Sequence, residues 1–308
     1  MSMRPGSSSG AAPPVVPAIR LSRDYERAVV AAKRRQGTWG RLTRGASIPA
    51  SQLRPEVRAL ATIAAVHERL VQPHWFSHES AALIWGLPLW RTPALTHVRQ
   101  QGRPGPGRDR AVLRHGGPVD DGRLTTVGHL PVTDLVQTMV DCARMLSALG
   151  GLVVADATLR AGADRATALS MLDEMGGRPG VARARVVVDL ADDGAESPGE
   201  TATRFVLLRD GLPRPATQIP ILTRAGTFFA DLGWEEWRAL LEYDGQAKYR
   251  SGQDLLDEKL REDAIRALDY RVVRVTKQDI RTRAGLSGRV RALLPASVGF
   301  VRRPLLRA

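Results

Sequence analysis

The second half of the chain carries acidic residues inside apolar runs, where a solvated surface charge is not expected. Asp231 stands within one such run, Glu242 ends the next, and Asp244 follows two residues later. Residues i and i+2 of a strand share a face, so Glu242 and Asp244 point the same way. If 227–234 and 238–245 pair as a hairpin, Asp231 lies beside both.

Three carboxylates at neighbouring strand ends repel one another unless a cation neutralises them. A hard divalent ion with oxygen ligands, Mg²⁺ or Mn²⁺, fits this set best. Such an ion activates water and stabilises charge on a phosphodiester during in-line attack. We therefore expect Asp231 and Glu242 to bind metal and Asp244 to complete the site. Lys248 is the candidate for holding the hydroxide or the phosphate, with a solvated loop lysine as the alternative.

A fourth acid, Glu200, begins the helix that precedes these strands. The run Ser-Pro-Gly-Glu from Ser197 to Glu200 is typical of a capping box, so Glu200 either only caps the helix or also lies near the metal. The other acids have simpler alternatives too. Asp231 and Glu242 are also compatible with salt bridges to buried arginines, and Asp244 with a tight Tyr-Asp-Gly turn.

The elements that must position these acids follow a break in the pattern near 192–200. From there the sequence predicts, in order, a helix at 198–209, strands at 217–222, 227–234 and 238–245, a charged helix at 252–268, a strand at 270–276 and a short helix. The expected fold class is α/β.

The first half is expected to be mainly helical, with a few strands. Helices are predicted at 24–36, 55–71, 77–86, 150–161, 165–175 and 179–192, strands at 94–100 and 111–116, and a short hairpin within 34–51. Pro131 predicts a further helix start, running to about Leu146. That helix would bury Cys142, the single cysteine, which excludes a disulfide framework.

Three segments of the second half, 197–213, 229–249 and 258–276, together resemble a domain family of unknown function related to the very-short-patch-repair endonucleases of the PD-(D/E)XK superfamily. The resemblance covers about residues 195–295. It implies a restriction-endonuclease-like α/β core with a divalent-metal site.

By position, the resemblance makes Glu200 the acid of the first helix, Asp231 the first strand acid and Glu242 the acid of the (D/E)XK element. Asp244 stands where the superfamily usually has its lysine. Either Lys248 replaces that lysine from the next turn, or the site binds metal poorly or not at all. None of the six histidines, which repair endonucleases of this type also use, lies in this half.

Segments 34–46, 76–89 and 132–144 are similar, more weakly, to antitoxin-type proteins of abortive-infection type IV toxin–antitoxin systems. This resemblance implies a winged-helix segment that binds DNA, of which only part is visible here, and a toxin partner encoded nearby. The domain boundaries that follow are a disordered tail at 1–22, an antitoxin-like region at 23–194, a nuclease-like domain at 195–296 and a basic tail at 297–308.

The formal net charge of +13 is concentrated at the two ends of the 308-residue chain. Residues 1–50 carry +7 and residues 271–308 carry +9, whereas the body between them carries −3. Two basic ends on a near-neutral body favour nucleic acid, most simply DNA, as the partner, although arginine-rich composition alone would also produce them. The candidate contact residues are Arg34, Arg35, Arg41, Arg44, Arg271 and Arg274.

No apolar run approaches about 18 residues, so we expect no transmembrane helix and a cytoplasmic location. The leading hypothesis is a DNA-binding protein whose endonuclease-like domain hydrolyses DNA phosphodiesters with Mg²⁺. The alternative is a non-catalytic, antitoxin-like DNA-binding regulator with a degenerate nuclease fold. A weaker third hypothesis is an RNA-directed nuclease or a protein-interaction module with the same fold.

Overall fold

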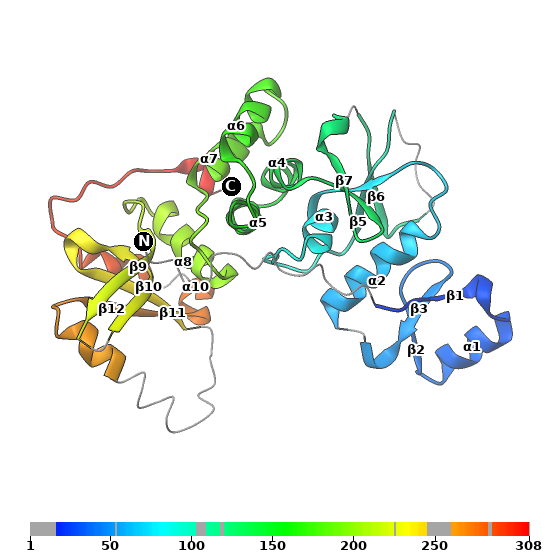
Figure 1. The fold of residues 1–308 in the computed structure, drawn as a ribbon, viewed down its shortest axis with the longest axis horizontal. Helices are drawn as coiled ribbons and strands as arrows, with labels where there is room; N and C mark the ends of the chain where they lie inside the picture. The colour runs from blue at the N-terminus through cyan, green and yellow to red at the C-terminus, as the bar shows by residue number, and fades with distance from the viewer. Residues whose placement is uncertain are drawn as a thin grey trace.

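The computed structural model describes residues 17–307 except 53, 103–108, 118–119, 225, 245–259 and 283–284. Sheets lie towards both ends of an elongated molecule, with a layer of helices between them (Figure 1). The α/β class expected from the sequence is confirmed. None of the described helices is long and apolar enough to cross a membrane.

A small three-stranded sheet begins the described chain. Its elements are β1 (Arg20–Leu21), α1 (Arg27–Arg35), β2 (Trp39–Arg41), β3 (Ala46–Pro49) and α2 (Pro55–His67). The expected hairpin is confirmed, because β2 and β3 pair antiparallel, with β1 on the other side of β3. Apolar side chains of the sheet, including Ile48, pack on Ala61 and Ala65 of α2.

The next sheet has five strands in the order β6-β5-β4-β8-β7. They are β4 (Trp75–Phe76), β5 (Thr96–Arg99), β6 (Val112–His115), β7 (Leu124–Val127) and β8 (Leu130–Thr133). Helix α3 (His78–Ile84) follows β4, and α2 and α3 share one apolar core with this sheet, built around Ile63, Phe76 and Val132. The strands predicted at 94–100 and 111–116 are β5 and β6, which pair in parallel.

The start predicted at Pro131 for the next helix was wrong. Pro131 lies in strand β8, where Leu130 and Val132 are buried on either side of it. The helix begins only at Leu135, because the Asp134 carboxylate accepts the amide of Gln137 and so caps it. The burial of Leu130 and Val132 in the sheet and the cap at Asp134 together outweigh the tendency of proline to begin a helix.

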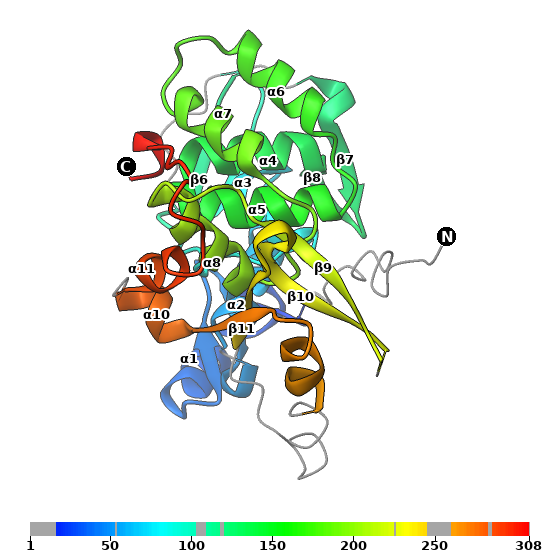
Figure 2. The ribbon, with the colours of Figure 1, turned by 90° about the vertical axis from the view of Figure 1, so that its left-hand side faces the viewer.

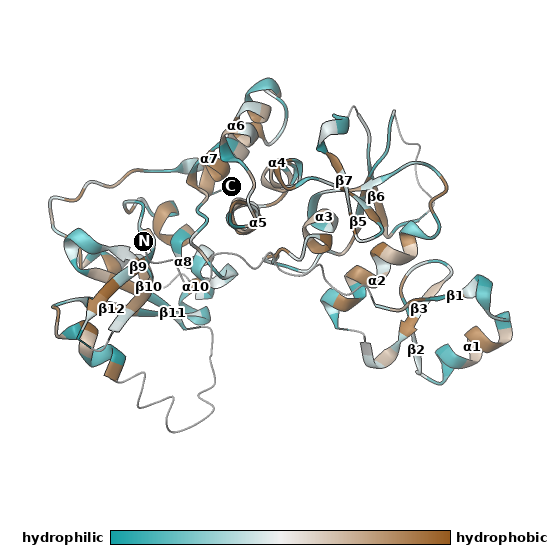
Figure 3. Cartoon of the chain, viewed as in Figure 1, coloured by the Kyte–Doolittle hydropathy of each residue, from teal (hydrophilic) through white to brown (hydrophobic). Residues whose placement is uncertain are grey.

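Four helices form the layer between the sheets: α4 (Leu135–Met145), α5 (Ala148–Arg160), α6 (Arg165–Glu174) and α7 (Val181–Leu190). Apolar residues dominate α4, α5 and α7, which appear largely brown in Figure 3. Cys142 is fully buried on α4, as expected. The final turn of the chain also enters this core through Leu306.

The second half follows the predicted order of helix, three strands, helix and strand. Its elements are α8 (Pro198–Arg209), β9 (Ala216–Thr223), β10 (Gly226–Trp234), β11 (Ala239–Asp244), a helix of which residues 260–266 are described, β12 (Arg271–Thr276), α10 (Lys277–Thr282) and α11 (Leu286–Arg291). Strands β9, β10 and β11 are antiparallel neighbours, and β12 lies parallel to β11.

The two faces of this second-half sheet are covered differently. Helix α8 lies beside β10 and β11 (Figure 2) and, with α10 and α11, packs on the face that carries Leu232 and Leu241. Ile265 of the helix at 260–266 packs on the other face with Leu240. A parallel neighbour requires such a crossover helix between the two strands.

A buried ion pair joins α8 to the helical layer. Two bonds of 2.6 and 2.7 Å run from one guanidinium nitrogen of Arg204 to the two carboxylate oxygens of Asp156, and neither side chain is more than 1% exposed. Arg204 also donates to the carbonyl of Leu190, and Thr201 and the amide of Asp192 donate to Asp156. These added bonds offset the loss of water around both charges.

Removing either partner of this pair should strongly destabilise the fold. We expect Arg204→Ala or Asp156→Ala to lower the free energy of unfolding by about 3–5 kcal/mol, because the remaining charge stays buried without its partner. Arg266→Ala, which removes an exposed pair with Glu262, should lower it by less than about 1 kcal/mol. Urea unfolding followed by circular dichroism measures both, and equal losses would contradict the prediction.

Candidate functional site

The first turn of α8 places Glu200 at the edge of the second-half sheet. Ser197 caps the helix by accepting the amide of Glu200, and its hydroxyl donates to the Glu200 carboxylate at 2.7 Å. The capping box is thus present, although the other carboxylate oxygen takes the amide of Glu196 rather than that of Ser197. A methyl group on Gly199 would overlap the Tyr243 ring, so glycine is what lets β11 approach this turn.

Asp231 lies on β10 at the point where its pairing with β11 ends. The two strands pair from Trp234 and Ala239 to Leu232 and Leu241. One residue further, the Asp231 carboxylate accepts the main-chain amide of Tyr243 at 2.7 Å. This side chain therefore takes a donor from β11 at the end of the ladder and holds the strands together there.

Glu242 on β11 faces an arginine of the crossover helix. One guanidinium nitrogen of Arg261 donates both to the Glu242 carboxylate at 2.7 Å and to the carbonyl of Phe229 at 3.0 Å. Arg261 also acts electrostatically on Asp231. The guanidinium thus provides positive charge to the two acids that the sequence proposes as metal ligands.

Burial shapes the ionisation of these acids. It raises the pKa of Glu200 to about 7, against the bonds from Glu196 and Ser197, and the carboxylates of Asp231 and Glu196 raise it further. Burial also raises the pKa of Asp231, whereas the amide of Tyr243 and the charge of Arg261 act to lower it. The carboxyl groups of Glu200 and Asp231 therefore favour their protonated form more than usual unless a cation is close.

The structure thus brings together Glu200, Asp231 and Glu242, and adds Arg261, which the sequence analysis missed. Asp244 is exposed at the end of β11, and Lys248 lies outside the described residues. A signal for Arg261 was present in the sequence. It stands four residues before the apolar Ile265, so both occupy the same face of the helix, and Ile265 packs on the sheet.

These acids do not form a compact set of metal ligands. Within the described part of the chain, one group of three potential ligands has all its ligand atoms within 4.8 Å of one another, and it consists of histidines in the first half. As arranged, the acid site fits a guanidinium better than Mg²⁺, which requires near-octahedral oxygen ligands at about 2.0–2.1 Å.

The arginines proposed to contact nucleic acid divide into two sets. Arg34 donates to Ser47, Arg271 to the carbonyls of Trp237 and Leu293, and Arg274 to Glu262. The second set is exposed around α1 and the β2–β3 hairpin, and comprises Arg35, Arg41 and Arg44.

No protein-family model matches the chain. Two uncharacterized proteins of Mycobacterium tuberculosis, MT2308 of strain CDC 1551 and Rv2248 of strain H37Rv, are each 30% identical to it over 165 residues, which is 53% of this chain and 61% of theirs. The chain thus spans about three fifths of the length of these curated relatives. The crystal structure of the RV2827C protein from the same organism covers 56% of this chain and 72% of its own, with 17% identity and a TM-score of 0.38.

Replacing Glu200 should change how stability depends on pH. Because the pKa of Glu200 is about 7 in the folded protein and 4.5 ordinarily, its stabilising contribution is complete below 4.5 and is lost as the pH rises through about 7. Glutamine does not ionise. We therefore expect the unfolding free energy of Glu200→Gln to improve relative to the wild type as the pH rises from about 4.5 to about 8.

Urea unfolding of both proteins across this pH range measures that difference. The pH-dependent contributions of the titratable groups that the two proteins share cancel when one free energy is subtracted from the other. A difference that does not change with pH would show that Glu200 ionises normally.

Proposed function

We propose that the protein is a non-catalytic, antitoxin-like DNA-binding regulator, in which a domain with a nuclease-like arrangement uses Arg261 as the cation of its acidic site. The observation that carries this proposal is the 2.7 Å bond between Arg261 and Glu242, together with the effect of Arg261 on Asp231. The acids expected to bind metal already have a positively charged neighbour supplied by the chain itself.

The order of elements in the second half supports a nuclease-type ancestry. A helix, three antiparallel strands, a crossover helix and a parallel strand are the elements that a restriction-endonuclease-like core requires, and they carry Glu200, Asp231 and Glu242 at the expected positions. Asp244 stands where the superfamily usually has its lysine. This substitution is consistent with a domain that has kept the nuclease fold and lost phosphodiester hydrolysis.

The exposed arginines support contact with DNA. Arg35 ends α1, Arg41 ends β2 and Arg44 lies in the turn between β2 and β3, which matches a helix with a basic wing. The residues just before α1 contact the hairpin through an edge-on packing of the rings of Tyr25 and Trp39, whose centroids are 5.1 Å apart. Positive side chains on such a unit bind the phosphate backbone with little dependence on base sequence.

The proposal carries two further expectations. The first is a cytoplasmic location, where the protein would meet DNA. The second is a partner, a toxin encoded nearby, as expected for an antitoxin-like protein.

A second candidate function, a Mg²⁺-dependent endodeoxyribonuclease, is favoured by one specific observation. Glu200 and Asp231 interact and both have raised pKa values, and crowded acids of this kind gain from a bound divalent ion. In that case Asp231 and Glu242 would hold the metal, after Arg261 had moved away from Glu242.

The role of Arg261 is tested by adding metal to a variant that lacks it. We expect Mg²⁺ or Mn²⁺ at millimolar concentration to raise the melting temperature of Arg261→Gln, because its acids then lack their guanidinium, and to leave the wild type unchanged. Arg266→Gln, an exposed arginine of the same helix, is the matched control and should behave like the wild type.

Calorimetric titration with metal, with and without a DNA duplex, and nicking of supercoiled plasmid complete this test. Metal-dependent nicking by the wild type that disappears in both Asp231→Asn and Glu242→Gln would replace the regulator with the endonuclease. Nicking that survives in both variants would indicate a contaminating nuclease.

DNA binding should depend on the exposed arginines near the hairpin. The triple variant Arg35→Ala, Arg41→Ala, Arg44→Ala should bind duplexes of any sequence more weakly, and the slope of log affinity against log salt should fall by up to about 3. The charge-matched control replaces three exposed arginines elsewhere, Arg178, Arg224 and Arg266, with alanine. Fluorescence anisotropy measures both, and equal losses would mean that only net charge matters.

A further inference from the structure

All six histidines of the chain lie in the first half and gather into two groups of three. One group contains His67, His74 and His129, and the other contains His78, His97 and His115. These residues are spread over some sixty positions of the sequence, so their grouping is a product of the fold. The second group, which we call the inner triad, is the more buried.

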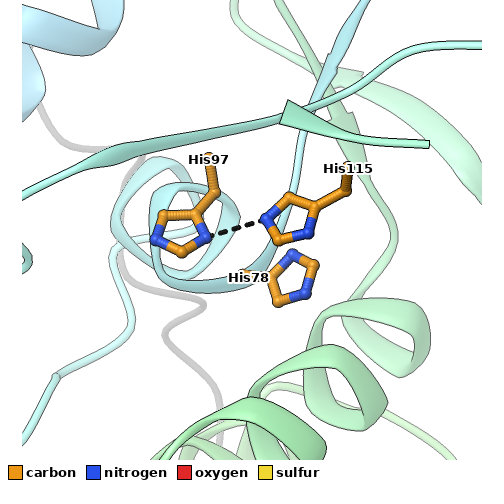
Figure 4. A group of neighbouring side chains, drawn as sticks. All are labelled: His78, His97 and His115. Atoms are coloured by element: carbon orange, nitrogen blue, oxygen red, sulfur yellow. Dashed lines mark hydrogen bonds between the residues drawn. The ribbon is translucent and has the colours of Figure 1, made fainter. Parts of the chain in front are cut away.

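Three different elements supply the inner triad, as Figure 4 shows. His78 begins α3, His97 lies on β5 and His115 ends β6. His97 pairs with Leu113 across the parallel strands, so His115, two residues further along, is on the same face. His78 has a left-handed φ of +53°, which is uncommon for a residue other than glycine.

The ring nitrogens of the inner triad lie close enough to one another to be drawn onto one metal ion. Nδ1 of His97 and Nε2 of His115 are joined by a 3.1 Å hydrogen bond, which an ion between them would replace, and the rings of His78 and His115 stack with centroids 3.9 Å apart. One ligand atom from each of the three residues fits within 4.8 Å of the others. Tetrahedral ligands on zinc, at about 2.0–2.1 Å, are about 3.3–3.4 Å apart.

Carboxylates lie at the outer nitrogens. Nδ1 of His78 is hydrogen-bonded to Oγ of Ser77 at 2.9 Å and lies 3.7 Å from a carboxylate oxygen of Asp141. Nε2 of His97 is 3.5 Å from a carboxylate oxygen of Glu79. Histidines that bind metal commonly place their second nitrogen towards a carboxylate, which fixes the tautomer and makes the ligand more basic. Asp141 is itself held by Arg99 and Gln137, so it is suited to this supporting position.

Burial disfavours the protonated form of all three rings. Burial lowers the pKa of His78 to about 3, against Asp141, and that of His97 to about 4, and it also lowers that of His115. His78 and His97 are 7% and 3% exposed, whereas His115 is half-buried and provides the side from which an ion can enter.

We propose that His78, His97 and His115 form a Zn²⁺ site, supported from outside by Asp141 and Glu79. Nδ1 of His97, Nε2 of His115 and Nε2 of His78 are the ligand atoms, because the remaining nitrogens of His78 and His97 face the carboxylates. Three imidazoles leave one position of a tetrahedral ion open to water or to an anionic group. This site is separate from the acids of the second-half sheet and does not depend on their function.

The other group of histidines shares one of these features and lacks the rest. Nδ1 of His67 and Nε2 of His74 are also 3.1 Å apart, but within the described residues this group is not one whose three ligand atoms all lie within 4.8 Å of one another. Nδ1 of His74 faces the carbonyl of Gln72 at 2.9 Å, and the rings of His67 and His129 are 5.9 Å apart. His129 is exposed. This group is therefore the internal control for any unspecific affinity of histidine for zinc.

Zinc binding is measured on the untagged full chain, because a histidine tag would itself bind the metal. After treatment with EDTA, the protein is titrated with Zn²⁺ alone in competition with a chelator of known affinity. We expect one ion per chain, and a loss of affinity of more than about 100-fold in His115→Gln. Glu79→Gln should weaken binding by about 10–100-fold, and His129→Gln should bind as the wild type does.

A second measurement guards against variants that fail to fold. Circular dichroism without metal checks each variant, and Co²⁺ added to the wild type should give the visible absorption of a four- or five-coordinate site that one equivalent of Zn²⁺ abolishes. The proposal is overturned if the wild type takes up no stoichiometric zinc, if folded His115→Gln binds it equally well, or if His129→Gln loses it to the same extent.

Discussion

The buried pair of Asp156 and Arg204 is the interaction on which the arrangement of the two halves depends. It connects α5 to α8, and side chains of α8 enter both the helical core, through Phe205, and the core of the second-half sheet, through Val206. Hydrogen bonds from Thr201 and from main-chain groups help to offset the cost of burying this charge pair, although Nε of Arg204 has no hydrogen-bond partner. Hydrophobic packing alone would not specify the rotation of α8 so closely.

That rotation decides where the first turn of α8 points, and so creates the acidic site. Ser197 and Glu200 must stand above the end of the β10–β11 ladder for Glu200 to interact with Asp231. On the opposite face the crossover helix brings Arg261 to Glu242. The acids are therefore assembled by two helices that pack on different faces of one sheet, and the charge balance of the site depends on both.

The two halves handle buried titratable groups in different ways. In the second-half sheet, acids crowd together, and a guanidinium from the same chain bonds to Glu242 and acts on Asp231. In the inner triad, burial keeps three imidazoles neutral, and the nearby carboxylates Asp141 and Glu79 face their outer nitrogens. The first arrangement balances charge from within the chain, whereas the second gathers imidazole nitrogens that are joined to each other and to Ser77 by hydrogen bonds and that a cation could share.

The sequence by itself determined the α/β class, the hairpin within 34–51, the cap at Ser197 and the order of elements beyond 198, because these depend on residues close together in the chain. It also identified the acids, since a carboxylate within an apolar strand is conspicuous. Only the tertiary structure decided that Pro131 lies in a strand, that Arg261 faces Glu242, and that the histidines gather in threes. Each of these depends on strand pairing or helix packing between distant segments, and no local pattern records which distant partner a side chain will meet.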